Sequence, residues 1–187
     1  MARLKKNKGN GGTESALAGP QALNQAVWQI CDVLRRSNCA SALQYVPELT
    51  WILFLRVLDE QEAREAEEAE ALGLDYEASL QPPYRWQEWA APWSDDPAAP
   101  RTSEGKPLGW KRRVLQEGKR GEFFAFVNGE LLPYLHGLRD RPGATPKQKV
   151  ISEILSSIER VRVDTEANFA DVLDRVHGLR VAGTDTQ

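Results

Sequence analysis

Five consecutive apolar residues at positions 51–55 constrain the fold of this chain more than any other feature. With the apolar residues that follow Arg56, they leave a helix without a polar stripe, and such a helix has to be surrounded by protein. The run is too short to cross a bilayer, which takes about 20 apolar residues. An amphipathic pattern precedes it, with apolar side chains at helical spacing: Leu23, Val27, Ile30 and Leu34. We therefore expect a helical hairpin over residues 23–59 at the centre of a small all-α domain.

The bounds of the second arm are predicted by one proline and one glycine. Pro47 is expected in the first turn of the helix, where its missing N–H leaves no hydrogen bond unmade. The helix is expected to continue to about Leu72, because Gly73 can adopt the left-handed conformation that ends a helix. Its distal part is too polar for a core, so we expect it to project into solvent or to meet a partner.

The remainder of the chain predicts further helices around an irregular stretch. Residues 79–109 contain six prolines, which exclude a long helix, and three tryptophans, whose apolar area predicts packing against the domain. Thr145 before Pro146, and later Asp164 or Thr165, are typical helix caps. The side chains expected to face inward on these helices are Phe123, Phe126 or Val127, Leu131, Leu135, Val150, Ile151, Ile154, Leu155, Ile158, Phe169, Val172, Leu173 and Val176. The predicted fold is an all-α multi-helix bundle with a Pro/Trp-rich irregular insertion.

The order of residues in four segments matches a known pattern. Residues 23–35 have the sequence LNQAVWQICDVLR, and after a polar turn with a tyrosine residues 49–59 have the sequence LTWILFLRVLD. The triplet YRW at residues 84–86 and a closing helix at residues 168–179 complete the pattern. In this order the chain resembles the N-terminal helical domain of the modification (methyltransferase, M) subunit of type I restriction-modification systems. The resemblance covers residues 22–187.

This resemblance implies that the parent protein transfers a methyl group from S-adenosylmethionine to adenine N6 in double-stranded DNA. It also implies a complex with a specificity subunit, a second modification subunit and the restriction subunit. The family's glycine-rich methyl-donor loop and its Asn-Pro-Pro-aromatic tetrapeptide follow the N-terminal domain, and neither occurs in this chain. We therefore expect no catalytic, cofactor-binding or metal-binding residues here, and we expect this chain alone to be inactive.

Domain boundaries are predicted from composition and from the resemblance. Residues 1–20, with three lysines and four glycines, are expected to form a flexible basic tail. Residues 21–180 are expected to form the helical N-terminal domain, and residues 181–187 a linker toward an absent catalytic domain. The N-terminus has no apolar segment typical of a secretory signal, and Cys31 and Cys39 do not make a disulfide framework. We expect a cytoplasmic protein.

Two charged stretches are the candidate contact regions. The formal charge of −3 is no signature of nucleic-acid binding, but residues 59–77 are strongly acidic. A basic cluster lies further along the chain: Lys111, Arg112, Arg113, Lys119 and Arg120. We predict that this cluster contacts DNA phosphates or a partner subunit, with a plain solvated helix face as the open alternative. The acidic stretch is better explained by a helix that its own charges keep in solution than by a docking site.

Two further patterns suggest chemistry and do not support it. Residues 81–84 (QPPY) are close to the Asn-Pro-Pro-Tyr motif that holds a flipped adenine, but the first residue is Gln and no glycine-rich loop precedes it. We interpret this segment as a loop. His136 and His177 lack neighbours at metal-ligand spacing. The alternative to a methyltransferase subunit is a stand-alone helical adaptor that binds protein and has no DNA role.

Overall fold

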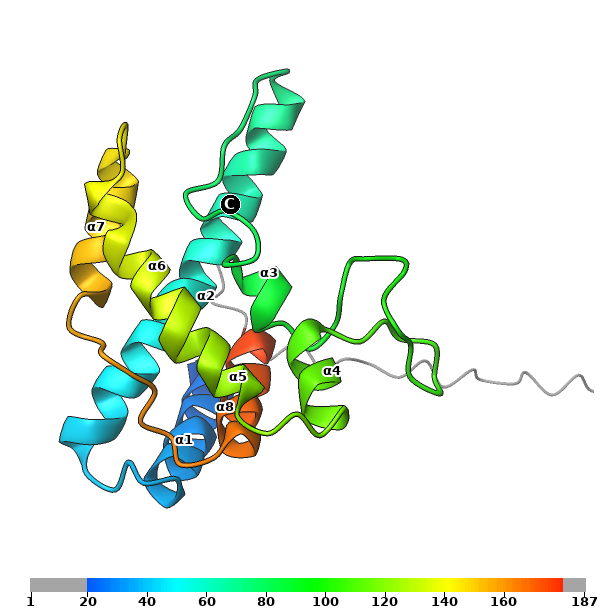
Figure 1. Ribbon diagram of the computed structural model, residues 1–187, viewed down its shortest axis with the longest axis vertical. Coiled ribbons are helices and arrows are strands. Elements are labelled where there is room, and N and C mark those ends of the chain that lie inside the picture. Colours follow the sequence, from blue (N-terminus) through cyan, green and yellow to red (C-terminus); the bar gives the residue numbers. More distant parts are fainter. Residues whose placement is uncertain (1–19, 180–187) are drawn as a thin grey trace, which may run out of the picture.

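The computed structural model describes residues 20–179, whose helices pack around one core (Figure 1). The elements in chain order are α1 (Pro20–Arg36), α2 (Ala42–Ala71), α3 (Trp86–Trp89), α4 (Trp110–Gln116), α5 (Glu122–Phe126), the π-helix η1 (Val127–Leu131), α6 (Leu132–His136), the 3-10 helix η2 (Gly137–Asp140), α7 (Pro146–Leu155) and α8 (Glu166–Gly178). These residues form no strand, only isolated bridges from Trp93 to Leu108 and from Arg101 to Pro107. The predicted all-α fold is confirmed, while the expected tail (except Pro20) and the expected linker lie outside the described residues.

The second arm of the predicted hairpin is α2, which runs through the domain and projects beyond it with its distal end (Figure 1). Trp51, Ile52 and Leu55 are almost fully buried, whereas Val57 is 37% exposed. Protein therefore covers most of the apolar half of α2 and leaves one side of it partly exposed to solvent. Gly73 follows the helix with a φ of 67°, as predicted. Neither α2 nor any other helix among residues 20–179 has the length and apolar character to cross a bilayer.

The start of α2 differs from the prediction, because the helix begins at Ala42 and Pro47 lies in its second turn. The N–H of Ser41, just before the helix, donates to the Gln44 side chain (3.2 Å), which stabilises this earlier start. Pro47 cannot donate to the carbonyl of Leu43, but Leu43 is 86% exposed, so water reaches that carbonyl. The proline is therefore tolerated inside the helix.

Helices α1 and α8 form an antiparallel pair against α2. The Asp164 N–H, just before α8, donates to the Ser37 carbonyl just after α1 (3.3 Å), and Arg175 near the other end of α8 reaches Gln29 (3.4 Å). Thr165 is the residue that caps α8. The fully buried residues of the pair are Ile30, Leu34, Phe169, Val172, Leu173 and Val176. The predicted inward face of the last helix is confirmed.

A continuous helical rod is formed by α5, η1, α6 and η2. The side chains predicted to face inward, Phe123, Val127, Leu131 and Leu135, are fully buried, and so are Leu132 and Leu138. Pro133 lacks the N–H that would bond to the Gly129 carbonyl. Just before it, the Leu132 N–H donates to the Val127 carbonyl five residues back, so the rod takes a π-helical turn at the proline.

Helix α7 folds back along α6 and η2 and starts at the predicted cap, Thr145. Ile151 and Leu155 are buried, but Val150 and Ile154 are 53% and 45% exposed. The prediction that all four face inward was wrong for the latter two. The physical reason is that α7 lies at the edge of the bundle, so only one of its faces meets other helices (Figure 1).

The Pro/Trp-rich insertion packs on the domain, as predicted. Trp86 and Trp89, on the short helix α3, are 1% exposed and meet edge to face with ring centroids 5.7 Å apart. Gly109 lies close to the backbone that follows α3, since a Cβ there would stand 2.3 Å from the Ala91 carbonyl oxygen. Only glycine allows this approach, which holds the returning end of the insertion against the domain.

Candidate functional site

The predicted basic cluster begins on α4, and its first member points into the protein. The Lys111 side chain is fully buried, and its Nζ donates to the Asp174 carboxylate and to the Ala170 carbonyl (3.4 Å), both on α8. Burial lowers the pKa of Lys111, and the Asp174 carboxylate opposes that shift. Lys111 therefore joins α4 to α8 and is not accessible to a DNA phosphate.

The other four members of the cluster point in different directions. Arg112 pairs with Asp174 (3.0 Å) and lies over the Trp93 ring at 4.3 Å. Arg113 lines a cleft on the domain. Lys119 and Arg120 are exposed on the loop between α4 and α5, where Lys119 pairs with carboxylates on both sides of it. The five residues thus do not share one face, and of them only Lys119 and Arg120 are exposed. The contact of the cluster with DNA or a partner stays a prediction.

The acidic stretch is likewise divided between interior and surface. Glu62 is 8% exposed, and it accepts the Ser79 N–H (3.0 Å) and pairs with Lys147 Nζ (3.3 Å). Glu65 accepts from Lys147 (2.9 Å) and from the Tyr76 hydroxyl (2.8 Å), and these hydrogen bonds lower the pKa of Glu65. Lys147 therefore ties α2 to α7. The sequence contains no local signal for this tie, because its partners lie 82 residues apart.

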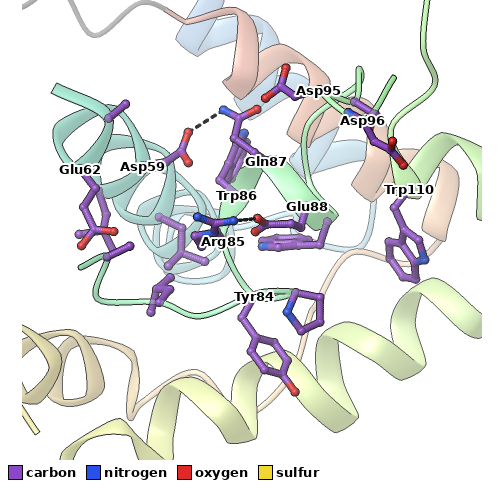
Figure 2. A pocket seen from close by; sticks show the side chains of 18 of the residues that line it. Asp59, Glu62, Tyr84, Arg85, Trp86, Gln87, Glu88, Asp95, Asp96 and Trp110 are labelled. Atoms are coloured by element: carbon purple, nitrogen blue, oxygen red, sulfur yellow. Dashed lines mark hydrogen bonds and ion pairs between the residues drawn. The ribbon is translucent and has the colours of Figure 1, made fainter. Parts of the chain in front are cut away.

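A cleft of about 860 Å³ opens between distal α2, α3, α4 and η1 (Figure 2). This volume is within the range of ligand pockets. Aromatic side chains line it: Tyr84, Trp86, Trp89, Trp110 and Phe126. Carboxylates surround them: Asp59, Glu62, Glu88, Asp95, Asp96 and Glu130. In Figure 2, Asp59 and Glu62 stand on the α2 side, Asp95 and Asp96 on the opposite side, and Arg85 and Glu88 between them.

Several polar groups of this cleft already have partners. Asp59 accepts from Gln87 Nε2 (2.8 Å) and from Arg56 Nη1 (2.9 Å), and burial raises the pKa of Asp59 against these bonds. Arg85 pairs with one oxygen of Glu88. These contacts attach α3 to α2 and leave the centre of the cleft open.

Four other polar atoms in the lining are buried without any hydrogen-bond partner among residues 20–179. They are Arg85 Nε, Glu88 Oε2, Trp89 Nε1 and Arg113 Nε. A buried polar group without a partner is unfavourable by about 1–3 kcal/mol, so four such atoms in one cleft indicate a place for a ligand or solvent. The cleft is the candidate binding site of this domain.

His177 holds one of the side chains that line the cleft, Trp86, in place. Its Nδ1 accepts the Trp86 Nε1 hydrogen at 3.1 Å, which attaches the end of α8 to α3. Burial lowers the pKa of His177 to about 4, and the positive charges of Arg56 and Lys111 add to the shift. The imidazole is therefore neutral near pH 7, as an acceptor for Trp86 has to be.

The comparisons with known proteins identify the region that builds most of this cleft. The profile of the HsdM N-terminal domain family matches residues 23–103. Residues 23–103 belong to the HsdM N-terminal domain family. No curated protein sequence matches the chain significantly.

Two solved structures resemble this chain. A modification subunit of a putative type I restriction enzyme from Vibrio vulnificus YJ016 has a TM-score of 0.60 and 22% identity, over 87% of this chain and 31% of that chain. A chain from a structure on complex assembly and conformational transition of the type I R-M system has a TM-score of 0.56 and 30% identity, over 86% of this chain and 26% of that chain. The present chain thus spans less than a third of either protein.

Among residues 20–179, no group of His, Cys, Asp and Glu side chains could hold a metal ion. The QPPY segment packs as a loop, as interpreted from its sequence. Tyr84 stacks on Tyr134 with ring centroids 3.8 Å apart, and the Gln81 N–H donates to the Tyr134 hydroxyl (2.8 Å). Tyr84 and Gln81 thus contact Tyr134 within the domain. The cleft beside them was not predicted from the sequence.

Proposed function

We propose that residues 21–180 act as the non-catalytic, DNA- and subunit-contacting domain of a type I modification subunit. The observation that carries this proposal is the match of the HsdM N-terminal domain to residues 23–103, together with a like fold over most of the chain. The whole protein would transfer a methyl group from S-adenosylmethionine to adenine N6 in double-stranded DNA, in the cytoplasm. It would do so with a specificity subunit, a second modification subunit and the restriction subunit.

The DNA contact is assigned to the end of the domain that carries Lys119 and Arg120. The Gly121 N–H beside them donates to Glu166 of α8 (2.9 Å), which brings their loop to the segment before α8. That segment carries Arg160 and Arg162, both exposed. Both loops lie at the same end of the domain as the turn between α1 and α2 (Figure 1). We call Lys119, Arg120, Arg160 and Arg162 the basic end.

The acidic cleft supports the same division of surfaces. Six carboxylates line the cleft against the two guanidinium groups of Arg85 and Arg113. DNA phosphates are repelled by such a surface, since like charges at close range disfavour contact. The basic end is therefore a better partner for DNA than the cleft is.

The test is DNA binding by the full modification subunit assembled with its specificity subunit. All four residues of the basic end are changed to Glu. The Kd is expected to rise at least about tenfold, and the salt slope to fall by about one unit for each lost phosphate contact. Fluorescence anisotropy on a labelled duplex over a range of salt concentrations measures both quantities.

A matched control changes four exposed cations at the opposite end to Glu. They are Arg64, Arg139, Arg141 and Lys149. This variant has the same net charge, so a change in Kd and slope restricted to the first variant supports the proposal. Equal effects in both variants, or no effect in either, would overturn the assignment of the basic end. No finding favours the alternative of a stand-alone adaptor.

A further inference from the structure

The lining of the cleft of about 860 Å³ contains buried hydrogen-bond donors and a buried acceptor that have no partner among residues 20–179. An occupant would therefore have to offer both acceptors and donors. Trp89 is 1% exposed, yet its indole Nε1 has no partner among residues 20–179, and the guanidinium Nε atoms of Arg85 and Arg113 are buried and also without one. Glu88 Oε2 is a buried acceptor that also has no partner among these residues. An extended polypeptide offers carbonyl oxygens for the first three atoms and N–H groups for the fourth. The geometry of the cleft therefore favours a peptide.

The charge of the cleft adds a second condition on this peptide. Asp95, Asp96 and Glu130 line it, are exposed, and make no ion pair within residues 20–179. Trp110 and Tyr84 offer aromatic surfaces beside them. Carboxylates next to aromatic rings favour lysine and arginine side chains, by ion pairing and by cation–π contact. The occupant should be a basic peptide.

The chain itself carries such a segment, at residues 1–8. Its charged residues are Arg3, Lys5, Lys6 and Lys8, with no acidic residue among them. No other stretch outside residues 20–179 has this composition, since residues 180–187 contain one arginine and one aspartate. The charges of this segment complement those of the cleft.

The start of α1 lies on the same side of the domain as the cleft. Because α1 and α8 are antiparallel, α1 begins where α8 ends, and the end of α8 touches Trp86 through His177. Eleven residues, 9–19, connect the basic segment to Pro20. An extended chain covers about 3.3–3.6 Å per residue, so this connection reaches about 35–40 Å, which is close to the width of a domain of this size.

We propose that residues 1–8 bind in the acidic cleft of the same molecule. Lys5, Lys6 and Lys8 pair with Asp95, Asp96 and Glu130 there, and the backbone of the segment supplies partners to Trp89 and the two arginines. The cleft is thus occupied within one chain, and the basic segment is held away from other acidic surfaces. This inference is independent of the proposed role in DNA binding.

Zero-length carbodiimide cross-linking of the full chain tests this pairing, because the reagent joins a lysine amine only to a carboxylate in contact with it. The sample is an equimolar mixture of unlabelled and 15N-labelled protein, analysed by mass spectrometry. Cross-links from the segment's lysines to the three cleft carboxylates are expected within chains of one label. Their yield should exceed that to the exposed Glu67, Glu68 and Glu70 of α2 about fivefold, and about 1 M salt should abolish the difference.

A second measurement uses two matched variants and the acetylation rates of Lys5, Lys6 and Lys8. One variant is Asp95→Asn, Asp96→Asn and Glu130→Gln, and the control is Glu67→Gln, Glu68→Gln and Glu70→Gln. The three lysines should acetylate about threefold faster in the first variant than in the wild type, and at the wild-type rate in the control. Both variants change exposed residues, so both are expected to fold.

Three outcomes would overturn the proposal. Mixed-label pairs in about half of these cross-links would mean that a second copy occupies the cleft, because random pairing between chains in an equimolar mixture gives that proportion. Equal yields to the cleft and to α2 would mean nonspecific attraction between opposite charges. Equal acetylation rates in the two variants would mean that the cleft does not hold the segment.

Discussion

The acidic stretch on distal α2 and the basic stretch around α4 each have a high density of charges of one sign. The structure buries one member of each and leaves others in solvent. Lys111 lies in the core with a single carboxylate beside it, whereas Glu62 lies near the surface with a backbone N–H and a partly exposed lysine. The comparison shows that charge density does not decide a residue's role. The partner that the fold brings to it does.

The largest effect is expected from removing the partner of Lys111. Asp174→Ala leaves a fully buried ammonium group with only the Ala170 carbonyl, so the free energy of unfolding should fall by about 3 kcal/mol. Urea denaturation followed by tryptophan fluorescence measures it. Asp171→Ala, on the same helix but at an exposed ion pair, is the control and should change the stability by less than about 1 kcal/mol.

The double variant Lys111→Met and Asp174→Ala sharpens this result. It removes both charges, and an apolar side chain of similar length replaces the lysine in the core. Most of the lost stability should return, since apolar replacements of buried ion pairs are often neutral. A double variant as unstable as Asp174→Ala alone would show that Asp174 acts by packing and not by its charge.

A smaller loss is expected in the acidic stretch. Glu62→Ala leaves the Ser79 N–H buried without its acceptor and weakens the tie from Lys147, which should lower stability by about 1–3 kcal/mol. Glu67→Ala, one of the exposed members of the same stretch, should stay within about 0.5 kcal/mol. Equal effects of the two changes in thermal unfolding would remove the distinction between the buried and the solvated glutamates.

The last effect, which depends on pH, is expected from the titration of half-buried His177. Its pKa is about 4 in the folded domain, against 6.5 for an unperturbed histidine, so the unfolded chain binds the proton first as the pH falls. The stabilisation is therefore complete above pH 6.5 and is lost between pH 6.5 and about 4. His177→Asn keeps an acceptor for Trp86 but does not titrate, so its stability should fall less than that of the wild type between about pH 7 and pH 4.5. Parallel pH curves for the two proteins in urea denaturation would contradict this expectation.

The parts of the fold that follow from local pattern were predictable. The spacing of apolar residues in α8 and the Thr145 cap of α7 depend on neighbours within a few residues, and both predictions were confirmed. Val150 and Ile154 show where the pattern fails, because a helix at the edge of a bundle can carry apolar residues that nothing covers. The start of α2 failed for a different reason. A hydrogen bond between Ser41 and Gln44 prevailed over the proline as the helix signal.

The candidate site was much less predictable. Its aromatic residues were visible in the sequence, and their packing on the domain was expected, but their arrangement around a cleft was not. The residues of the predicted basic cluster are neighbours in the sequence but do not form one surface, because successive residues of α4 point to different sides of the helix. Lys119 and Arg120 stay a prediction for DNA contact, which binding measurements have to decide.

The sequence by itself determined the helices, most of their buried faces and the family of residues 23–103, because periodicity, capping and residue order are local properties. The tertiary structure alone decided which charges are interior and where a binding cleft lies. Lys111 and Asp174 are 63 residues apart, and Lys147 and Glu65 are 82 apart. No local pattern encodes such pairs, since they form only when the packing of apolar faces has brought their helices together.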